Sequence, residues 1–365
     1  MNIGVPRERR TMEYRVGFTP AGVELLTQEG HTCYVEHEAG LGAGFSDYDY
    51  ERAGARIVYT SDEVFGRADL LLKVSRPTDE ELQWMLDGQI LTGFLHLASA
   101  RRAKITTLLE KKVTAIAYEL IQKEDGSLPV LKSMSQVGGR MVAQVGATLL
   151  QNNYGGKGIL VGGVPGVPPA EVVILGAGAS GTEAAKAFLG LGASVCMLDK
   201  DLERLQEIDQ LFGGCIVTMV SHPFNIAKVV RFADILVGAV LVPGERAPIL
   251  VTREMVRSMR PRAVIIDASI DQGGCVETSR PTTHASPTYV EEGILHYCVP
   301  NMSGVIARTA THAFNNAAWP HIQNLVRLGL DEALKEDAPL AQGVATRAGE
   351  IVNPALKAVY ESGNH

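Results

Sequence analysis

The stretch VVILGAGASGTEAAKA at positions 172–187 decides the fold of the second half of the chain. It places the pattern Gly-x-Gly-x-x-Gly directly after an apolar strand and before an alanine-rich helix. Gly176 permits a tight turn, Gly178 lets backbone amides approach a pyrophosphate at the positive end of the helix, and Gly181 allows the helix to pack closely on the strand. The order of strand, glycine turn and helix therefore predicts a dinucleotide-binding site.

An acidic residue follows the glycines at the expected distance. Asp199 ends the next apolar strand, about 20 residues after the glycine pattern. A carboxylate at this place accepts hydrogen bonds from the adenosine ribose hydroxyls and repels a 2′-phosphate, which favours NAD as the cofactor. Lys200 beside it leaves some tolerance of NADP, and Asp201 is interpreted as a helix cap rather than a ligand.

Predicted strands alternate with helical segments on both sides of the glycine pattern, which indicates parallel sheets. The strands expected in the first 130 residues are Asn2–Val5, Thr32–Glu36, Leu70–Val74, Gln89–Gly93 and Ala115–Tyr118, with helices that include Thr19–Glu29 and Ala100–Lys111. The strands expected in the second series are Glu171–Leu175, Ser194–Leu198, Cys215–Val220, Ile235–Gly238, Ala263–Asp267 and His296–Val299. Six strands separated by helical segments are the number in a full doubly wound dinucleotide-binding domain.

The length of 365 residues is about two and a half times that of a typical domain, so two domains are expected. A helix is expected from Ser135 to about Asn152, and the glycine- and proline-rich segment 155–169 is expected to form a structured loop or domain junction. After Asn301 the chain is expected to be helical, including Ala317–Gly329, and to pack back on the first domain. The predicted fold class is α/β, with two Rossmann-like doubly wound domains, the N-terminal one discontinuous and completed by C-terminal helices. The predicted substrate (catalytic) domain is 1–130 plus 306–365, and the predicted NAD-binding domain is 131–305.

The composition restricts the class of protein. Hydrophobic residues make up 46% of the chain and charged residues 21%, which is enough apolar material for packed cores and too much for a disordered chain. The net charge is −7 without a basic run, so neither nucleic acid nor a membrane is expected as a partner. The N-terminal residues lack a signal-peptide core and no apolar run reaches the length of a membrane span, which predicts a soluble, cytoplasmic protein. The five cysteines include no Cys-x-x-Cys pair, so neither disulfides nor a metal site is expected.

Several short runs spread over nearly the whole chain form a specific combination. They are EYRVGFTPAGV (13–23), FLHLA (94–98), GGVPGV (162–167), VLVPG (240–244), IDQGGC (270–275), SRPTT (279–283) and YCVPNM (297–302). Together they resemble the bacterial NAD-dependent alanine dehydrogenases, which are relatives of the NAD-binding part of nicotinamide nucleotide transhydrogenase.

The resemblance implies both a reaction and the residues that perform it. Arg15 would hold the substrate carboxylate, His96 would hydrogen-bond the keto oxygen and exchange its proton, and Asp271 would act in the water and ammonia steps. These residue types suit the roles, because guanidinium binds carboxylate in a bidentate manner and imidazole transfers protons near neutral pH. The implied cofactor is NAD, and the residues expected to hold it are Gly176, Gly178, Ala179, Ser180, Gly181, Asp199, Ser135, Val240, Leu241, Asn301 and Met302. The implied partner is a small amino acid or 2-oxo acid, and the implied assembly is a homohexamer.

The chain departs from the family pattern in the expected substrate site. In the family this strand normally continues Lys-Val-Lys-Glu-Pro and its second lysine binds the substrate, whereas the sequence here is KVSRP at positions 73–77. Ser75 takes the place of that lysine. Lys73 shares a strand face with Ser75 but lies two residues back, and Arg76 points to the opposite face unless the strand ends there, so neither is an obvious substitute. Loss of a charge-assisted contact in the transition state typically lowers the rate by about a hundredfold to a thousandfold.

Three interpretations follow. The leading one is an NAD-dependent oxidoreductase acting on CH–NH₂ groups, which interconverts L-alanine and pyruvate plus ammonia. The second keeps the cofactor and Arg15 but changes the substrate to another amine or imine, such as an N-substituted amino acid or a cyclic imine. It accounts better for Ser75, and for Ser303 and Ala307 at positions where the family usually has prolines. The third is a catalytically weak NAD-binding regulator, and the retention of the three residues implied for substrate binding and catalysis argues against it.

Overall fold

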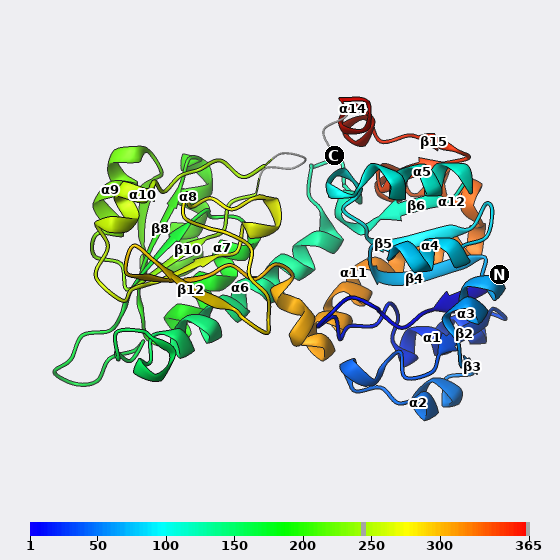
Figure 1. The fold of residues 1–365 in the computed structure, drawn as a ribbon, viewed down its shortest axis with the longest axis horizontal. Coiled ribbons are helices and arrows are strands. Elements are labelled where there is room, and N and C mark those ends of the chain that lie inside the picture. The colour runs from blue at the N-terminus through cyan, green and yellow to red at the C-terminus, as the bar shows by residue number, and fades with distance from the viewer. Residues whose placement is uncertain (242–245, 363–365) are drawn as a thin grey trace. The chain divides into compact units, whose positions relative to one another are not determined.

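Two sheets organise the chain, and each is covered by helices (Figure 1). The computed structural model describes residues 1–241 and 246–362. It divides into unit 1, which comprises Met1–Met134 and Gly304–His365, and unit 2, which comprises Ser135–Ser303. The predicted fold class, with two α/β units of which the first is discontinuous, is confirmed. The end of the VLVPG run, residues 242–244, lies outside the described residues.

Unit 1 contains an eight-stranded sheet of order β15-β14-β6-β5-β4-β1-β2-β3. The strands are β1 (Asn2–Val5), β2 (Thr32–Glu36), β3 (Arg56–Val58), β4 (Leu70–Ser75), β5 (Ile90–Phe94), β6 (Thr114–Ala117), β14 (Val344–Arg347) and β15 (Glu350–Ile351). Strands β1 to β6 pair in parallel, whereas β14 pairs antiparallel with both β6 and β15. The C-terminal segment thus completes unit 1 with strands as well as helices, which the sequence did not predict. Strands of two to four residues are too short to show a clear alternation of side chains.

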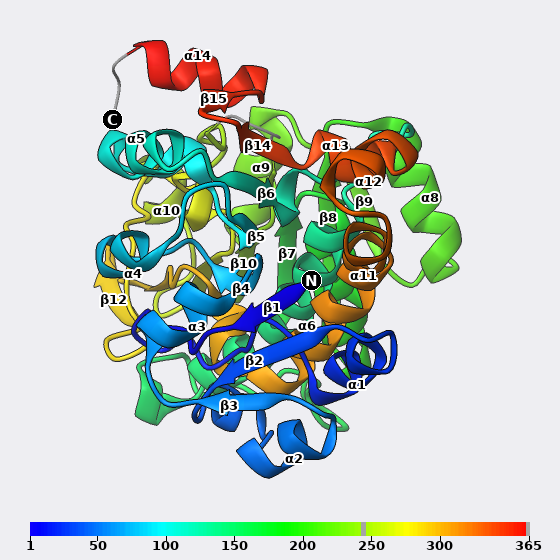
Figure 2. The same ribbon diagram turned by 90° about the vertical axis from the view of Figure 1, so that its right-hand side faces the viewer.

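Helices cover both faces of this sheet, as Figure 2 shows. One face carries α1 (Pro20–Gln28), α11 (Ala307–Leu328), α12 (Leu330–Glu336) and α13 (Ala338–Gln342). The other carries α3 (Ser61–Arg67), α4 (Asp79–Trp84), α5 (Arg102–Glu110) and α14 (Pro354–Ser362). A short helix, α2 (Asp47–Arg52), precedes β3. The helix α11 begins ten residues before the predicted Ala317 and ends one residue before Gly329.

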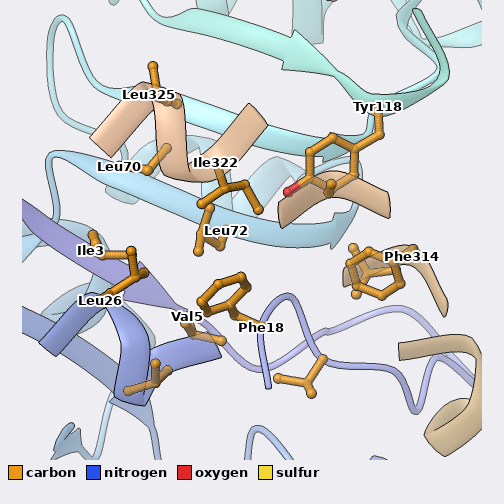
Figure 3. Packing of buried hydrophobic residues seen from close by; sticks show 14 of the residues in the cluster. Ile3, Val5, Phe18, Leu26, Leu70, Leu72, Tyr118, Phe314, Ile322 and Leu325 are labelled. Carbon is orange, nitrogen blue, oxygen red and sulfur yellow. The ribbon is translucent and has the colours of Figure 1, made fainter. Parts of the chain in front are cut away.

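The core of unit 1 follows from the alternation of side chains along its strands. Leu70 and Leu72 of β4 belong to the cluster beneath α1 and α11, whereas Leu71 between them belongs to the cluster on the opposite face. A period of two residues produces this division in any strand that is covered on both faces. Figure 3 shows the first cluster, with these labelled members: Ile3, Val5, Phe18, Leu26, Leu70, Leu72, Tyr118, Phe314, Ile322 and Leu325.

Unit 2 contains a seven-stranded sheet of order β12-β13-β11-β10-β7-β8-β9. The strands are β7 (Glu171–Leu175), β8 (Ser194–Asp199), β9 (Val217–Val220), β10 (Ile235–Gly238), β11 (Val264–Asp267), β12 (Thr288–Glu291) and β13 (Ile294–Tyr297). All pair in parallel except β12, which joins β13 antiparallel at the edge. The six parallel strands overlap the six predicted ones, although β9 begins two residues after the predicted Cys215 and β13 lies two residues before the predicted His296–Val299. In chain order their arrangement is the 3-2-1-4-5-6 of the dinucleotide-binding fold. The helices of this unit include α7 (Ala179–Gly190), α8 (Leu202–Phe212), α9 (Pro223–Val230) and α10 (Arg253–Arg257).

The division between the units falls within α6 (Pro129–Leu149), which starts earlier than the predicted Ser135. Proline is favoured in the first turn of a helix, so Pro129 suits this start. In unit 2, Gly146 of α6 lies close to Ile235, Ile266 and Phe188, where a Cβ would meet their side chains at 3.0–3.4 Å. Segment 155–169 contains neither helix nor named strand, as predicted. None of the helices in the described ranges is long and apolar enough to cross a membrane.

Candidate functional site

Each sheet has a place where the connections reverse direction. In unit 1 this is β1, which lies between β2 and β4, and in unit 2 it is β7, which lies between β8 and β10. In doubly wound sheets, ligands bind at the carboxyl ends of the strands beside such a reversal. Arg15 lies in the segment that follows β1, and the glycine pattern follows β7.

Arg15 lies in the segment between β1 and α1 and is only 5% exposed. Its Nε donates a hydrogen bond to Glu13 Oε1 at 2.7 Å, and its Nη2 donates to Glu13 Oε2 at 2.5 Å. Glu13 Oε2 also accepts a hydrogen bond from Ser75 Oγ at 3.0 Å. A buried bidentate pair of this kind restricts the guanidinium to one orientation. Glu13 was not predicted from the sequence, although a carboxylate two residues before the arginine was the available signal.

The segment that carries Arg15 is held by α11. Thr311 Oγ1 accepts from the Val16 amide at 3.3 Å, and Asn315 Oδ1 accepts from the Thr19 amide at 3.0 Å. On its other side the segment runs against β4, since a Cβ on Gly17 would lie 1.9 Å from the Leu72 carbonyl oxygen. Residues far apart in the sequence therefore position Arg15.

Lys73 is fully buried, and its ammonium lies between two buried carboxylates. The Nζ atom is 2.6 Å from Glu81 Oε1 and 3.4 Å from Glu8 Oε2. Burial by itself lowers the pKa of Lys73, but the two carboxylates outweigh it and raise that pKa above its ordinary value. Burial raises the pKa of Glu8, which shares the lysine with Glu81. The structure thus places Lys73 in a buried ion cluster that neutralises its charge, and not in a position open to a substrate.

Ser75 is the last residue of β4 and is held from two sides. Its amide donates to Glu8 Oε1 at 3.3 Å, and its hydroxyl donates to Glu13. Because the strand ends here, the alternation of side chains does not extend to Arg76. The Arg76 Nη1 atom donates to the His96 carbonyl oxygen at 2.5 Å, so this side chain turns toward the end of β5.

His96 follows β5 and adopts a left-handed backbone conformation with a φ of 42°. Its amide donates to Glu119 Oε1 at 2.6 Å, and its Nδ1 is 3.9 Å from the same oxygen. The imidazole is 55% exposed, which suits a group that exchanges protons with a ligand. Left-handed backbone outside glycine is uncommon and persists where surrounding contacts enforce it, as Glu119 does here. Glu119 was not predicted from the sequence.

The glycine pattern of unit 2 has the geometry of a phosphate cradle. Gly176 has a φ of +103°, and a Cβ there would lie 2.4 Å from the Ala239 carbonyl oxygen. A Cβ on Gly181 would lie 1.9 Å from the Gly176 carbonyl oxygen, whereas one on Gly178 would meet nothing within 4 Å. No side chain caps the start of α7 at Ala179 and Ser180. The open space at Gly178 and the uncapped first turn fit a dinucleotide pyrophosphate.

Asp199 at the end of β8 is linked to the same cradle. Its Oδ2 accepts from the Ala177 amide at 2.7 Å, and its Oδ1 accepts from the Asp201 amide at 3.0 Å. Each carboxylate oxygen has a second lone pair, so the group can still accept bonds from ribose hydroxyls. Asp201 caps α8 by accepting from the amides of Glu203 and Arg204, and its prediction as a cap is confirmed.

Asp267 at the end of β11 organises the loop that carries Asp271, the residue for which the family resemblance implies a catalytic role. It is 1% exposed and accepts from the amides of Ser269, Cys275 and Val276 at 3.1, 2.9 and 3.2 Å. Burial raises its pKa, which these hydrogen bonds oppose. The loop closed in this way carries Asp271. An aspartate directly after an apolar strand was the signal that could have identified Asp267.

The remaining predicted cofactor residues lie in the same unit. Ser269 Oγ accepts from the Val240 amide at 2.9 Å, and Asp271 Oδ2 lies 3.4 Å from the Asn301 amide nitrogen. Leu241 is exposed, Met302 is buried and Ser135 is half-buried at the start of the unit. Val240, Asp271 and Asn301 are therefore connected to the strand ends that adjoin the glycine cradle.

Family models match both halves of the chain. The model of the alanine dehydrogenase/PNT N-terminal domain matches residues 4–138, and the model of the C-terminal domain matches residues 142–354. An alanine dehydrogenase of Methanococcus maripaludis is 47% identical over 362 residues, which are 99% of this chain and 97% of the relative. Alanine dehydrogenase 2 of Staphylococcus aureus is 47% identical over 363 residues, with the same coverage.

Solved structures agree with this relationship. An L-alanine dehydrogenase matches with a TM-score of 0.95 and 46% identity over 99% of each chain. A transhydrogenase from Sinorhizobium meliloti matches with a TM-score of 0.83 over 96% of this chain and 100% of its own, and at 24% identity it shows only the shared fold. The chain therefore belongs to the alanine dehydrogenase/PNT family.

Proposed function

We propose that this chain is an NAD-dependent amino-acid dehydrogenase that interconverts L-alanine and pyruvate plus ammonia. The observation that carries the proposal is the pair formed by Arg15 and Glu13 at the carboxyl end of the unit 1 sheet, where the exposed His96 is held by Glu119. A guanidinium that a carboxylate holds in one orientation and an accessible imidazole suit the carboxylate and the keto oxygen of a 2-oxo acid. Relatives named alanine dehydrogenase over nearly the full length support the same reaction.

In this proposal, Arg15 binds the substrate carboxylate, and Glu13 keeps the guanidinium in place. His96 donates a proton to the keto oxygen during reduction and removes it during oxidation, and Asp271 assists the exchange of water and ammonia. The nicotinamide of NAD supplies or accepts the hydride when bound. The proposal assigns substrate binding to unit 1 and NAD binding to unit 2.

The cofactor assignment is also part of the proposal. Gly176, Gly178 and Gly181 form the turn for the pyrophosphate, and Asp199 binds the ribose hydroxyls and discriminates against a 2′-phosphate. The remaining expected contacts are Ala179, Ser180, Ser135, Val240, Leu241, Asn301 and Met302. A homohexamer is the assembly proposed from the family resemblance, and light scattering on the purified protein tests it.

A direct assay tests the proposed reaction. NADH absorbance is followed with pyruvate and ammonium, and in reverse with L-alanine and NAD, for the wild type and for Ser75→Lys. We expect turnover of about 1 s⁻¹ or more in the wild type, the ordinary range for enzymes. An inactive Arg15→Gln variant that keeps its thermal stability would show that the activity belongs to this site.

The second candidate is a family member redirected to another amine or imine, and Ser75 is the observation that favours it. A hydroxyl in place of the family's lysine removes a cation from the substrate site and leaves room for a bulkier or more basic amine. If the wild type is inactive on alanine and pyruvate while Ser75→Lys is active, the alanine reaction is excluded for the natural chain. That result would support a family member that acts on another amine or imine.

A further inference from the structure

The chain changes direction at His96, directly after β5. Phe94, Leu95 and Leu97 are buried, with exposed fractions of 7%, 0% and 4%, whereas the imidazole of His96 is 55% exposed. His96 has a φ of 42° and a ψ of 49°, so the backbone leaves the extended conformation at this residue. All residues of β5 are buried, and the left-handed turn is what directs the imidazole outward. The exposure of the imidazole therefore depends on the contacts that keep His96 in this conformation.

Two opposite charges hold the peptide groups on the two sides of His96. The Glu119 carboxylate accepts from the amides of Leu95 at 3.1 Å and of His96 at 2.6 Å. The Arg76 guanidinium donates through Nη1 to the His96 carbonyl oxygen at 2.5 Å. An anion at the amides and a cation at the carbonyl both match the direction of the peptide dipole, and charge-assisted hydrogen bonds are about twice as strong as neutral ones. Arg76 and Glu119 therefore hold the turn from both ends.

The sheet brings these two charges to the same turn. Strand β5 lies between β4 and β6. Arg76 directly follows the last residue of β4, and Glu119 lies two residues after the end of β6. The His96 carbonyl oxygen also accepts from Ser99, whose amide lies at 3.1 Å and whose hydroxyl lies at 3.0 Å. Those bonds are neutral and local, whereas the bond from Arg76 is charged and ties the turn to the neighbouring strand.

Arg76 is partly buried and keeps its charge at neutral pH. Burial and the nearby Arg10 lower the pKa of Arg76 to about 10, and Glu119 opposes this shift. The opposition reflects an attraction between Arg76 and Glu119 across the turn. The family pattern given above has a glutamate at the position of Arg76, and a carboxylate could not donate to the His96 carbonyl oxygen. A cation that holds this carbonyl is thus a feature of the present chain.

We propose that Arg76 is a positioning residue for His96, which together with Glu119 fixes the left-handed turn and so holds the imidazole where it exchanges a proton with the substrate. Arg76 acts through His96 and not on the reacting atoms. The Phe94 ring restrains the imidazole as well, since the two rings are stacked at 18° with centroids 6.5 Å apart. The inference rests on the proposed function, which assigns the proton exchange to His96.

Steady-state kinetics test this role. Arg76→Met removes the donor and its charge, and we expect kcat for pyruvate reduction to fall by about 10- to 100-fold, the range for one hydrogen bond to a charged group. The KM for pyruvate, whose carboxylate is assigned to Arg15, should change by less than about threefold. Arg76→Lys retains a cation and should recover part of kcat. Arg101→Met is the matched control, because Arg101 forms an exposed pair with Asp79, and it should leave both constants unchanged.

A variant without the imidazole separates positioning from a general loss of structure. In His96→Ala the group that Arg76 positions is absent, so the addition of Arg76→Met should lower kcat no further. The same fall in kcat with and without the imidazole would overturn the inference, because Arg76 would then act independently of His96. An unchanged kcat in Arg76→Met on its own would overturn it as well.

Hydrogen exchange tests the turn even if no amino acid is turned over. Glu119 holds the amides of Leu95 and His96, so the loss of the bond at the carbonyl end in Arg76→Met should speed their exchange by about tenfold or more. Mass spectrometry of peptides that cover residues 94–100 provides the measurement, with Arg101→Met as the control. If the wild type is inactive, the proposed function fails, whereas faster exchange in Arg76→Met still supports the positioning of His96. Exchange at the wild-type rate in Arg76→Met would overturn the inference whatever the activity.

Discussion

The carboxyl ends of the two sheets are built from different groups. In unit 1 the strand ends carry charged side chains that hold one another, namely Arg15 with Glu13 and Lys73 with Glu8 and Glu81. In unit 2 the strand ends are shaped by backbone, with glycines that exclude a Cβ and with Asp199 and Asp267 accepting from backbone amides. A site made of side chains depends on single residues, so one substitution alters its charge. A site made of backbone is insensitive to most substitutions, because its shape depends on the conformation of the glycine turn.

The largest effect is expected from breaking the ion cluster of unit 1. Lys73→Met leaves the carboxylates of Glu8 and Glu81 buried without their cation, and we expect a loss of about 3–5 kcal/mol in the free energy of unfolding. Urea denaturation measures this loss. The triple variant with Glu8→Gln and Glu81→Gln should recover much of the stability, because no uncompensated charge remains. An unchanged free energy of unfolding in Lys73→Met would contradict the buried cluster.

Two glycine variants examine the backbone site of unit 2. Gly181→Ala places a Cβ against the Gly176 carbonyl oxygen, so we expect a loss of about 1–3 kcal/mol in stability from overpacking. Gly178→Ala has open space and should leave the thermal midpoint nearly unchanged while it weakens NADH binding. Thermal unfolding and NADH fluorescence titration separate the two effects. Equal losses of stability in both variants would show that the space at Gly178 is not reserved for a ligand.

A smaller effect, on cofactor selectivity, is expected from a substitution of Asp199 in the same site. Asp199→Asn removes the charge that repels a 2′-phosphate, and we expect the ratio of NAD to NADP affinity to fall about tenfold, since hydrogen bonds to charged groups contribute about 1.5–3 kcal/mol. The dissociation constants of both reduced cofactors provide the measurement. Glu203→Gln, on the first turn of α8, serves as a control for charge alone. An unchanged ratio in Asp199→Asn would remove this residue from the cofactor site.

The smallest effect is expected away from both sheet edges, where His321 Nδ1 lies 2.7 Å from Asp337 Oδ2. Burial opposes ionisation of Asp337, but the amide of Leu340 and the side chains of His321 and Asn324 hold its pKa below the ordinary value. A depressed pKa contributes stability above the unfolded pKa, and this contribution is lost as the pH falls through the folded pKa. Asp337→Asn should therefore cost about 1 kcal/mol near neutral pH and nothing in strong acid. Urea denaturation at several pH values tests this, and a pH-independent difference would contradict it.

Much of the fold could be predicted because its signals are local. The strands Asn2–Val5, Thr32–Glu36 and Ile235–Gly238 have the predicted bounds, and the cap at Asp201 is where the sequence placed it. Each depends on residues that are neighbours in the chain, such as an apolar run or a polar residue before a helix. Strand β14 could not be predicted in this way, because its pairing with β6 joins residues more than 200 positions apart, and β15 has only two residues and pairs with β14 alone.

In the candidate site, too, the features with local signals could be predicted, whereas those that depend on residues distant in sequence could not. The sequence by itself determined the glycine turn of unit 2 and the acidic residue that ends β8, since both follow from local patterns, whereas the roles expected of Arg15, Ser75 and His96 came from the family resemblance. Only the tertiary structure decided that Lys73 is enclosed by Glu8 and Glu81, and that Arg76 turns toward His96. The physical reason is that strand alternation gives the face of a side chain, whereas its burial and charge partners come from elements that are distant in sequence.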